Sequence, residues 1–279
     1  MARKIYVTAA LAAAVGFAAP AHAGFILVQD RAGPVYKVDT VGTNDSIFRS
    51  LADVPSTQPA NSPNALGTNL NDSGLYRTQF PDVGDAAEFY RDDDLLGTLP
   101  VLGNGIAAGD VLDDTYYYID RSSRLRSVDN ISALDGTNTP VADLIRDLGD
   151  LETLGDLAVA GGPGQIFISH NDAAFSVVDT DGTKLTTVTA SNRYAGLAFA
   201  GGDLFGVTGG NNSVSDLYAL SFTGTALTET FVRTLDGIRG TDASVVPLPA
   251  AAWMFLGGIG AAGAYNRYLR RKKDAAENA

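Results

Sequence analysis

An internal repeat constrains the fold of this chain more than any other feature of its sequence. Segment 196–205 reads GLAFAGGDLF and segment 156–167 reads DLAVAGGPGQIF, so the two match when the second carries a two-residue insertion. In both, an apolar strand-like run is followed by a glycine-rich turn, a second and a third such run, and then a Thr-rich run. Each copy therefore predicts a unit of about four short strands.

Weaker copies of this unit start near Leu66 and Ile106, and a last opening stands at Ile238. Together with Leu157 and Leu197 of the strong pair, the openings are spaced by 40, 51, 40 and 41 residues. A period of this length is typical of the four-stranded blade of a β-propeller.

The two ends of the repeat region complement each other. The last opening has no room for a full unit, whereas the region begins with three strand-like runs that lack an opening. We therefore expect residues 237–245 to join residues 25–50 in one shared blade and close a ring without a free edge strand. The predicted fold is all-β, a five-bladed β-propeller, although a β-sandwich or an open β-solenoid would give similar strand spacing. Residues 141–154, with apolar side chains at near-helical intervals, predict a short helix or an irregular excursion.

The first 23 residues have the three parts of a secretion signal. Arg3 and Lys4 precede an apolar run over 5–19, and Ala21 and Ala23 are the small residues that a signal peptidase reads. The sequence predicts cleavage by signal peptidase and a mature chain that starts at Gly24.

The composition changes again at residue 246, where a tail of three parts begins. An apolar stretch over 249–265 contains 17 residues, about 25 Å as a helix, the lower limit for crossing a bilayer. The basic cluster after it should stay in the cytoplasm, which places the repeat region outside the inner membrane. The short motif at the start of the tail consists of Val246, Pro247, Leu248, Pro249 and Ala250, and the basic cluster consists of Arg267, Arg270, Arg271, Lys272 and Lys273.

This tail resembles the sorting signals of exosortase-processed proteins of Gram-negative bacteria, and VPLPA looks like the variant of the PEP-CTERM signal that is named after those letters. The resemblance covers residues 246–279. It implies processing near the motif by an exosortase-like membrane protease, and release to the cell surface or the extracellular polymer matrix, where polysaccharide is the expected partner. It implies an address and no activity.

The region between the two terminal segments is strongly acidic. Residues 24–246 contain 30 acidic and 13 basic side chains, a net charge of -17. Such a surface repels nucleic acid, so no nucleic-acid partner is expected. Because 27 of the 30 acids are Asp, which favours turns, the composition agrees with many short strands.

Few residues suited to catalysis are present. The chain contains no cysteine, which excludes disulfides and thiolate chemistry. After removal of residues 1–23 only His170 remains to serve as a catalytic histidine, and a multi-histidine metal centre is excluded. His170 follows a strand-like run, so a position in a turn at a strand end is its ordinary interpretation. No catalytic residue is predicted.

Calcium is the one cofactor for which the sequence offers ligands. Asp179 and Asp181 alternate in a tight DTDG turn, where carboxylates can approach a calcium ion, but the same residues form an ordinary hairpin turn, which we favour. The acidic runs 92–94 and 113–114 would serve equally if the fold brought them together in a central channel.

Three functions remain open from the sequence. The first is an exported surface or matrix component, a non-enzymatic scaffold for binding. The second is a secreted propeller hydrolase or lactonase whose carboxylates and His170 gather at the channel mouth. The third is a periplasmic protein that keeps its tail as a permanent anchor.

Overall fold

The fold was examined in a computed structural model, which describes residues 24–30, 33–49, 64–69, 71–79, 86–101, 105–149, 155–160, 164–170, 172–209 and 214–246. These residues form five antiparallel sheets of four strands each. In four of the five sheets the strands are consecutive along the chain and each pairs antiparallel with the next, whereas the fifth joins β20 to β1.

The sheets are called blades and are numbered along the chain, with the strands given from the inside outwards. Blade 1 contains β20 (Gly240–Val245), β1 (Phe25–Asp30), β2 (Val35–Asp39) and β3 (Ser46–Arg49). Blade 2 contains β4 (Asn64–Thr68), β5 (Leu75–Gln79), β6 (Ala86–Arg91) and β7 (Asp94–Pro100). Blade 3 contains β8 (Ile106–Leu112), β9 (Thr115–Asp120), β10 (Arg124–Asp129) and β11 (Asp143–Asp147), with a 3-10 helix η1 (Ile131–Ala133) between the last two. Blade 4 contains β12 (Leu157–Ala160), β13 (Gln165–Ser169), β14 (Ala174–Asp179) and β15 (Lys184–Thr189). Blade 5 contains β16 (Tyr194–Ala200), β17 (Asp203–Thr208), β18 (Val214–Phe222) and β19 (Leu227–Asp236).

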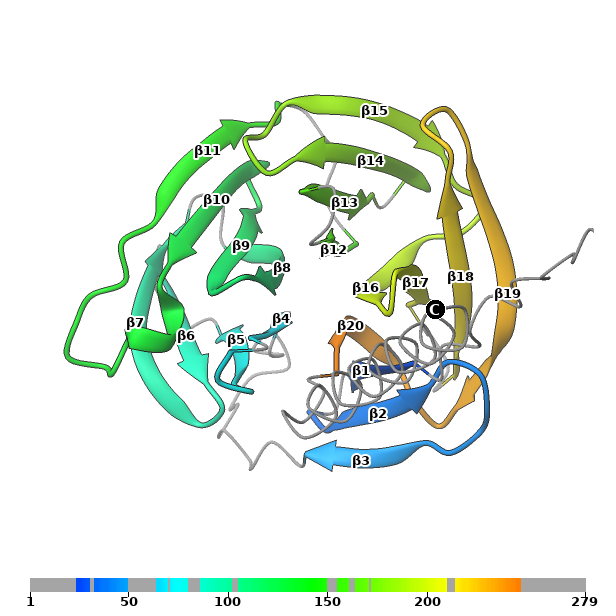
Figure 1. The fold of residues 1–279 in the computed structure, drawn as a ribbon, viewed down its shortest axis with the longest axis horizontal. Helices are drawn as coiled ribbons and strands as arrows, with labels where there is room; N and C mark the ends of the chain where they lie inside the picture. Colours follow the sequence, from blue (N-terminus) through cyan, green and yellow to red (C-terminus); the bar gives the residue numbers. More distant parts are fainter. Residues whose placement is uncertain are drawn as a thin grey trace, which may run out of the picture.

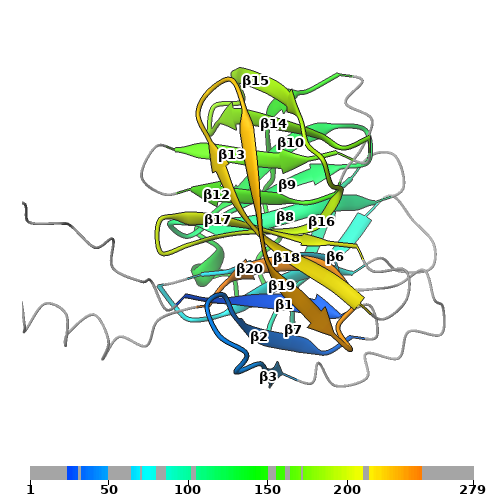
Figure 2. The same ribbon diagram turned by 90° about the vertical axis from the view of Figure 1, so that its right-hand side faces the viewer.

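The blades are arranged as a closed ring, a five-bladed β-propeller, with β4, β8, β12, β16 and β20 around the centre (Figure 1). The predicted closure is confirmed, because β20 pairs antiparallel with β1 and places Ile26 opposite Val245. Figure 2 shows this last strand, in orange, beside the first, in blue. A β-sandwich and an open solenoid are therefore wrong.

Each predicted opening of the repeat lies at or next to an innermost strand. Leu66 lies within β4, Ile106 begins β8, Leu157 begins β12 and Leu197 lies within β16, while Ile238 stands two residues before β20. The irregular spacing of 51 residues reflects the long connection that carries η1 and precedes β11.

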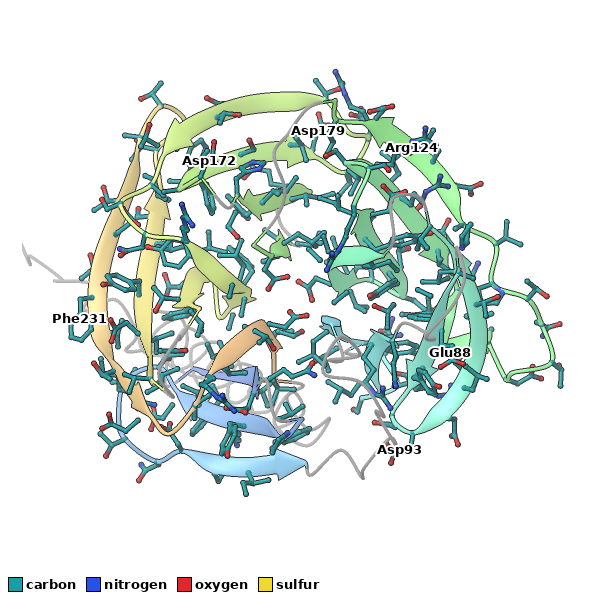
Figure 3. The ribbon with its side chains drawn as sticks, turned by 180° about the vertical axis from the view of Figure 1, so that it is seen from behind. Glu88, Asp93, Arg124, Asp172, Asp179 and Phe231 are labelled. Carbon is teal, nitrogen blue, oxygen red and sulfur yellow. The ribbon has the colours of Figure 1, made fainter. Side chains whose placement is uncertain are left out.

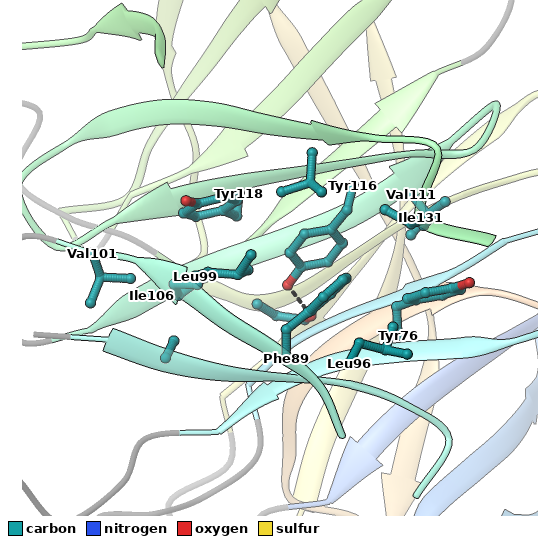
Figure 4. Packing of buried hydrophobic residues seen from close by; sticks show 13 residues of the cluster. Tyr76, Phe89, Leu96, Leu99, Val101, Ile106, Val111, Tyr116, Tyr118 and Ile131 are labelled. Carbon is teal, nitrogen blue, oxygen red and sulfur yellow. Dashed lines mark hydrogen bonds between the residues drawn. The ribbon is translucent and has the colours of Figure 1, made fainter. Parts of the chain in front are cut away.

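The hydrophobic core is divided among the contacts between neighbouring blades. Because side chains of a strand alternate between the two faces, one blade can pack on both sides at once. On β9, Tyr116 and Tyr118 face blade 2, whereas Tyr117 packs toward blade 4. Figure 4 shows the first of these contacts, in which the ring of Tyr116 lies 4.8 Å from that of Phe89 between their centroids.

Residues 141–149 of the segment 141–154 are described, and the helix expected over them is wrong. Residues 143–147 form β11, which pairs with β10 as the outermost strand of blade 3. Val141 and Leu144 are exposed, so the near-helical spacing of apolar residues marks no buried helical face. The backbone of β10 offers an unpaired edge at this point, and its hydrogen bonds decide the conformation of the segment.

The terminal predictions fall largely outside the described residues. In the part of the chain that the structure describes, no helix is both long and apolar enough to cross a membrane. The span predicted over 249–265 is not part of it.

Candidate functional site

Three aspartates gather at the centre of the ring. Asp110 lies on β8, Asp156 immediately precedes β12, and Asp242 lies on β20. Their exposed fractions are 3%, 1% and 0%, so water hardly reaches any of the three carboxyl groups. Figure 3 shows side chains from the innermost strands directed toward the centre of the ring.

The carboxyl groups satisfy backbone amides that the sheet geometry leaves unpaired. The innermost strand of a blade is an edge strand, so N–H groups on its channel side lack a partner within the blade. Asp110 Oδ2 accepts a hydrogen bond from the N–H of Val159 on β12 at 3.0 Å. Asp156 Oδ2 accepts one from the N–H of Leu197 on β16 at 2.6 Å. Each carboxyl thus joins its own blade to the next.

Asp242 repeats this arrangement at the point where the ring closes. Its Oδ2 accepts a hydrogen bond from the N–H of Leu66 on β4 at 2.7 Å, which joins the C-terminal strand to blade 2. Nearby, Ser244 Oγ donates to Asp110 Oδ1 at 3.2 Å and lies 3.2 Å from Thr68 Oγ1. Oxygen atoms from three blades therefore meet in one buried region.

Burial and mutual repulsion make these carboxyl groups weak acids. Burial raises the pKa of Asp110 to about 7. Burial raises the pKa of Asp242 to about 8, and the negative charge of Asp110 adds to this effect. Burial, followed by the negative charge of Asp242, raises the pKa of Asp156 well above its usual range. A desolvated carboxyl near a second one favours its neutral form.

His170 is placed by the structure in the interior of blade 4. It directly follows β13 and is 2% exposed, and its Nε2 lies 2.9 Å from Ser176 Oγ on β14. Ser176 Oγ in turn lies 2.6 Å from Thr187 Oγ1. Ser176 is 0% exposed. The arrangement ties three strands of the blade together.

Asp179 and Asp181 lie in the turn between β14 and β15, at the rim of the ring (Figure 3). Their carboxylates accept hydrogen bonds from Thr183, whose N–H contacts both and whose hydroxyl donates to Asp181. These bonds are those of the hairpin turn that the sequence predicts.

The acidic runs 92–94 and 113–114 do not meet in the centre of the ring. Asp93 lies at the rim (Figure 3), and Asp114 accepts hydrogen bonds from Asn69 and Ser132 in neighbouring turns. Among the described residues no three Asp, Glu or His side chains already surround a common point as metal ligands do.

Two residues of the terminal motifs are described. Gly24 accepts hydrogen bonds from the N–H and the hydroxyl of Thr40 through its carbonyl oxygen. Val246 packs against a cluster between blades 1 and 2 that contains Leu27 and Leu66. Ala21, Ala23, residues 247–250 and the basic cluster lie outside the described residues.

The sequence analysis missed the central aspartates. Asp110 and Asp242 each stand four residues after a repeat opening, and Asp110 interrupts the apolar run IAAGDVL. The sequence did contain a signal, because a charged residue stood within a strand that the neighbouring blades on both sides should bury.

The fold and its centre define the chain as a five-bladed β-propeller. No protein-family model and no curated protein sequence matches it. Among solved structures it is similar to a structural genomics protein of unknown function from Bacteroides thetaiotaomicron, with a TM-score of 0.50 and 12% identity. That match covers 80% of this chain and 62% of the other, so the chain spans about three fifths of the Bacteroides protein. A second match, to a structure of the mitotic checkpoint complex, has a TM-score of 0.45 and 12% identity, and covers 79% of this chain and 80% of that one. The first likeness concerns the fold alone, and the second is too low to support any argument.

Proposed function

We propose that this protein is exported, processed at both ends and sorted to the cell surface or the extracellular matrix, where its propeller acts as a non-enzymatic scaffold for binding. Signal peptidase, an exosortase-like membrane protease and the inner membrane are its processing partners. Extracellular polysaccharide is its proposed partner after release.

The observation that carries this proposal is the position of the ring between the two motifs. The first paired strand begins at Phe25, one residue after the predicted mature start, and the last ends at Val245, one residue before VPLPA. Because β20 and β1 are paired, cleavage at both motifs leaves every strand of the ring in place. A folded unit that ends where two independent processing signals begin is the arrangement expected of a released cargo.

The buried centre supports a scaffold over an enzyme. A hydrolase needs a carboxyl group or histidine that its substrate can touch. Asp110, Asp156 and Asp242 do gather in the centre, as the rival hydrolase requires, but their oxygens accept hydrogen bonds from neighbouring strands and are shielded from solvent. His170 is buried as well.

The test is the intact mass of the mature protein recovered from its native host. Wild-type cells are compared with cells that lack the processing protease. We expect a protein that starts at Gly24 in both strains and loses its C-terminal tail near Val246 only when the protease is present. A variant in which Pro247 and Pro249 are replaced by Ala should keep the tail in both strains.

Retention of the basic cluster in wild-type cells would overturn the sorting proposal. The protein would then be a permanently anchored periplasmic protein, which is the alternative that the sequence leaves open.

A further inference from the structure

The first residue of the VPLPA motif belongs to the folded ring. Val245 pairs with Ile26 on β1, and the next residue, Val246, is half-buried. The side chain of Val246 packs against the apolar cluster between blades 1 and 2. The buried members of this cluster are Leu27, Val35, Leu66 and Leu75. Val246 is therefore part of both the fold and the motif.

The residues just before the motif are held from several sides. Ala243 is buried in the contact between blades 1 and 5. Ser244 is 0% exposed, and its Oγ lies 3.2 Å from Thr68 Oγ1 on β4. A protease acts on a segment that is free of the fold, so cleavage at or before Val246 would require the end of β20 to leave the ring. That opening would break the contacts that close the ring.

Little chain remains between the ring and the predicted membrane segment. Pro247 and Leu248 are the two residues between Val246 and the apolar stretch 249–265. Two residues span at most about 7 Å. In the anchored protein that we propose, the ring therefore lies close to the membrane surface. The first pair of residues that a protease can bind without disturbing the ring is Pro247 and Leu248.

We infer that the folded ring decides where the protease cuts, an inference that rests on the proposed sorting function. Val246 stays on the mature protein, and the scissile bond lies on the C-terminal side of Leu248, between the ring and the membrane. Hydrolysis consumes one water molecule, breaks the C–N bond, and leaves a carboxyl group on the ring and an amino group on the tail. The mature protein then ends at Leu248, Pro249 or Ala250.

The first test identifies the C-terminal peptide of the mature protein from wild-type host cells by mass spectrometry. We expect a peptide that contains Val246 and ends at Leu248, Pro249 or Ala250. The same peptide should be absent from cells that lack the processing protease, where the tail remains attached.

The second test needs no processing, because it uses a purified chain of residues 24–250. Val246→Ala removes apolar contacts with the cluster between blades 1 and 2, so it should lower the thermal unfolding midpoint by about 2–4 °C. Leu248→Ala is the matched control. It lies beyond the last residue that packs on the ring in the described part of the chain, so it should leave the midpoint unchanged.

Two results would overturn the inference while leaving the sorting proposal intact. One is a mature protein that has lost its tail together with Val246. The other is a shift below about 1 °C for Val246→Ala, or an equal shift for Leu248→Ala, because the ring would then not hold the start of the motif. Retention of the whole tail in wild-type cells is a different result, since it would overturn the proposed function and this inference with it.

Discussion

Replacing Asp110 by Asn should change how the stability of the ring depends on pH. Asn does not ionise, and it keeps an oxygen that can accept the amide of Val159. Its amide NH2 can donate to Ser244 Oγ, although it cannot accept the N–H of Val111 as Asp110 Oδ1 does. The difference in unfolding free energy between the wild type and Asp110→Asn therefore reports the ionisation of Asp110, together with the smaller effect of its charge on Asp242.

The sign follows from the pKa in the two states. Asp110 has a pKa of about 7 in the folded protein, and an aspartate in the unfolded chain has a pKa of about 3.9. Between these values the folded state binds one more proton than the unfolded state, so the wild type loses stability as the pH rises. The stabilisation that protonated Asp110 gives the folded state is fully present below a pH of about 3.9 and is lost as the pH rises through about 7. The loss is about 1.4 kcal/mol per pH unit and about 4 kcal/mol in all.

The assay is urea unfolding followed by circular dichroism at pH 5.0 and 6.5. The wild type should lose about 2 kcal/mol relative to Asp110→Asn between these two conditions. Carboxylates with a lowered pKa, such as Asp39 beside the amides of Gly42 and Val41, lose their contribution to the unfolding free energy only at lower pH. Asp203→Asn, at the exposed first residue of β17, is the matched control. A constant difference between the wild type and Asp110→Asn would refute the reasoning, because the carboxyl group would then be ionised in the fold throughout this range.

Three further predictions concern how the ring is held together. A chain that ends at Val246 should unfold at the same temperature as the processed protein, whereas one that ends at Arg239 lacks β20 and should lose cooperative thermal unfolding. Gly155→Ala should lower the unfolding free energy by about 3 kcal/mol in urea titrations, because the new Cβ would stand 1.8 Å from the carbonyl oxygen of Tyr194. A loss of less than about 0.5 kcal/mol would contradict this close approach. Tyr116→Phe removes a buried 2.7 Å hydrogen bond to the carbonyl oxygen of Ala65 and should cost about 1–2 kcal/mol by the same assay, with Tyr117→Phe as a milder control.

Much of the architecture could be predicted from the sequence because propeller blades are local structures. The strands of blades 4 and 5 pair with their neighbours along the chain through short turns, so the repeat at 156–167 and 196–205 carries the whole pattern of one unit. The closure was predictable for a related reason, since the incomplete unit at residues 237–245 supplies the one strand that the unit at residues 25–50 lacks.

The segment 141–154 shows where sequence reasoning failed. The spacing of its apolar residues indicates a helical face, but Val141 and Leu144 are exposed, and the segment pairs as β11. The outermost strand of a blade has one face toward solvent and few packing constraints, so its side chains carry little information about its conformation.

The sequence by itself determined the repeat and the four-stranded blade, because four of the five blades are each formed by one continuous segment of the chain. It also predicts the address signals at the two ends, which are short continuous motifs. Only the tertiary structure decided which of the 30 acids in the body form a site. Asp110, Asp156 and Asp242 are 46 and 86 residues apart along the chain, and closure of the ring brings them into one buried centre. Their carboxyl groups become weak acids there because the blades remove water from all three at once, an effect that none of their sequence neighbours produces.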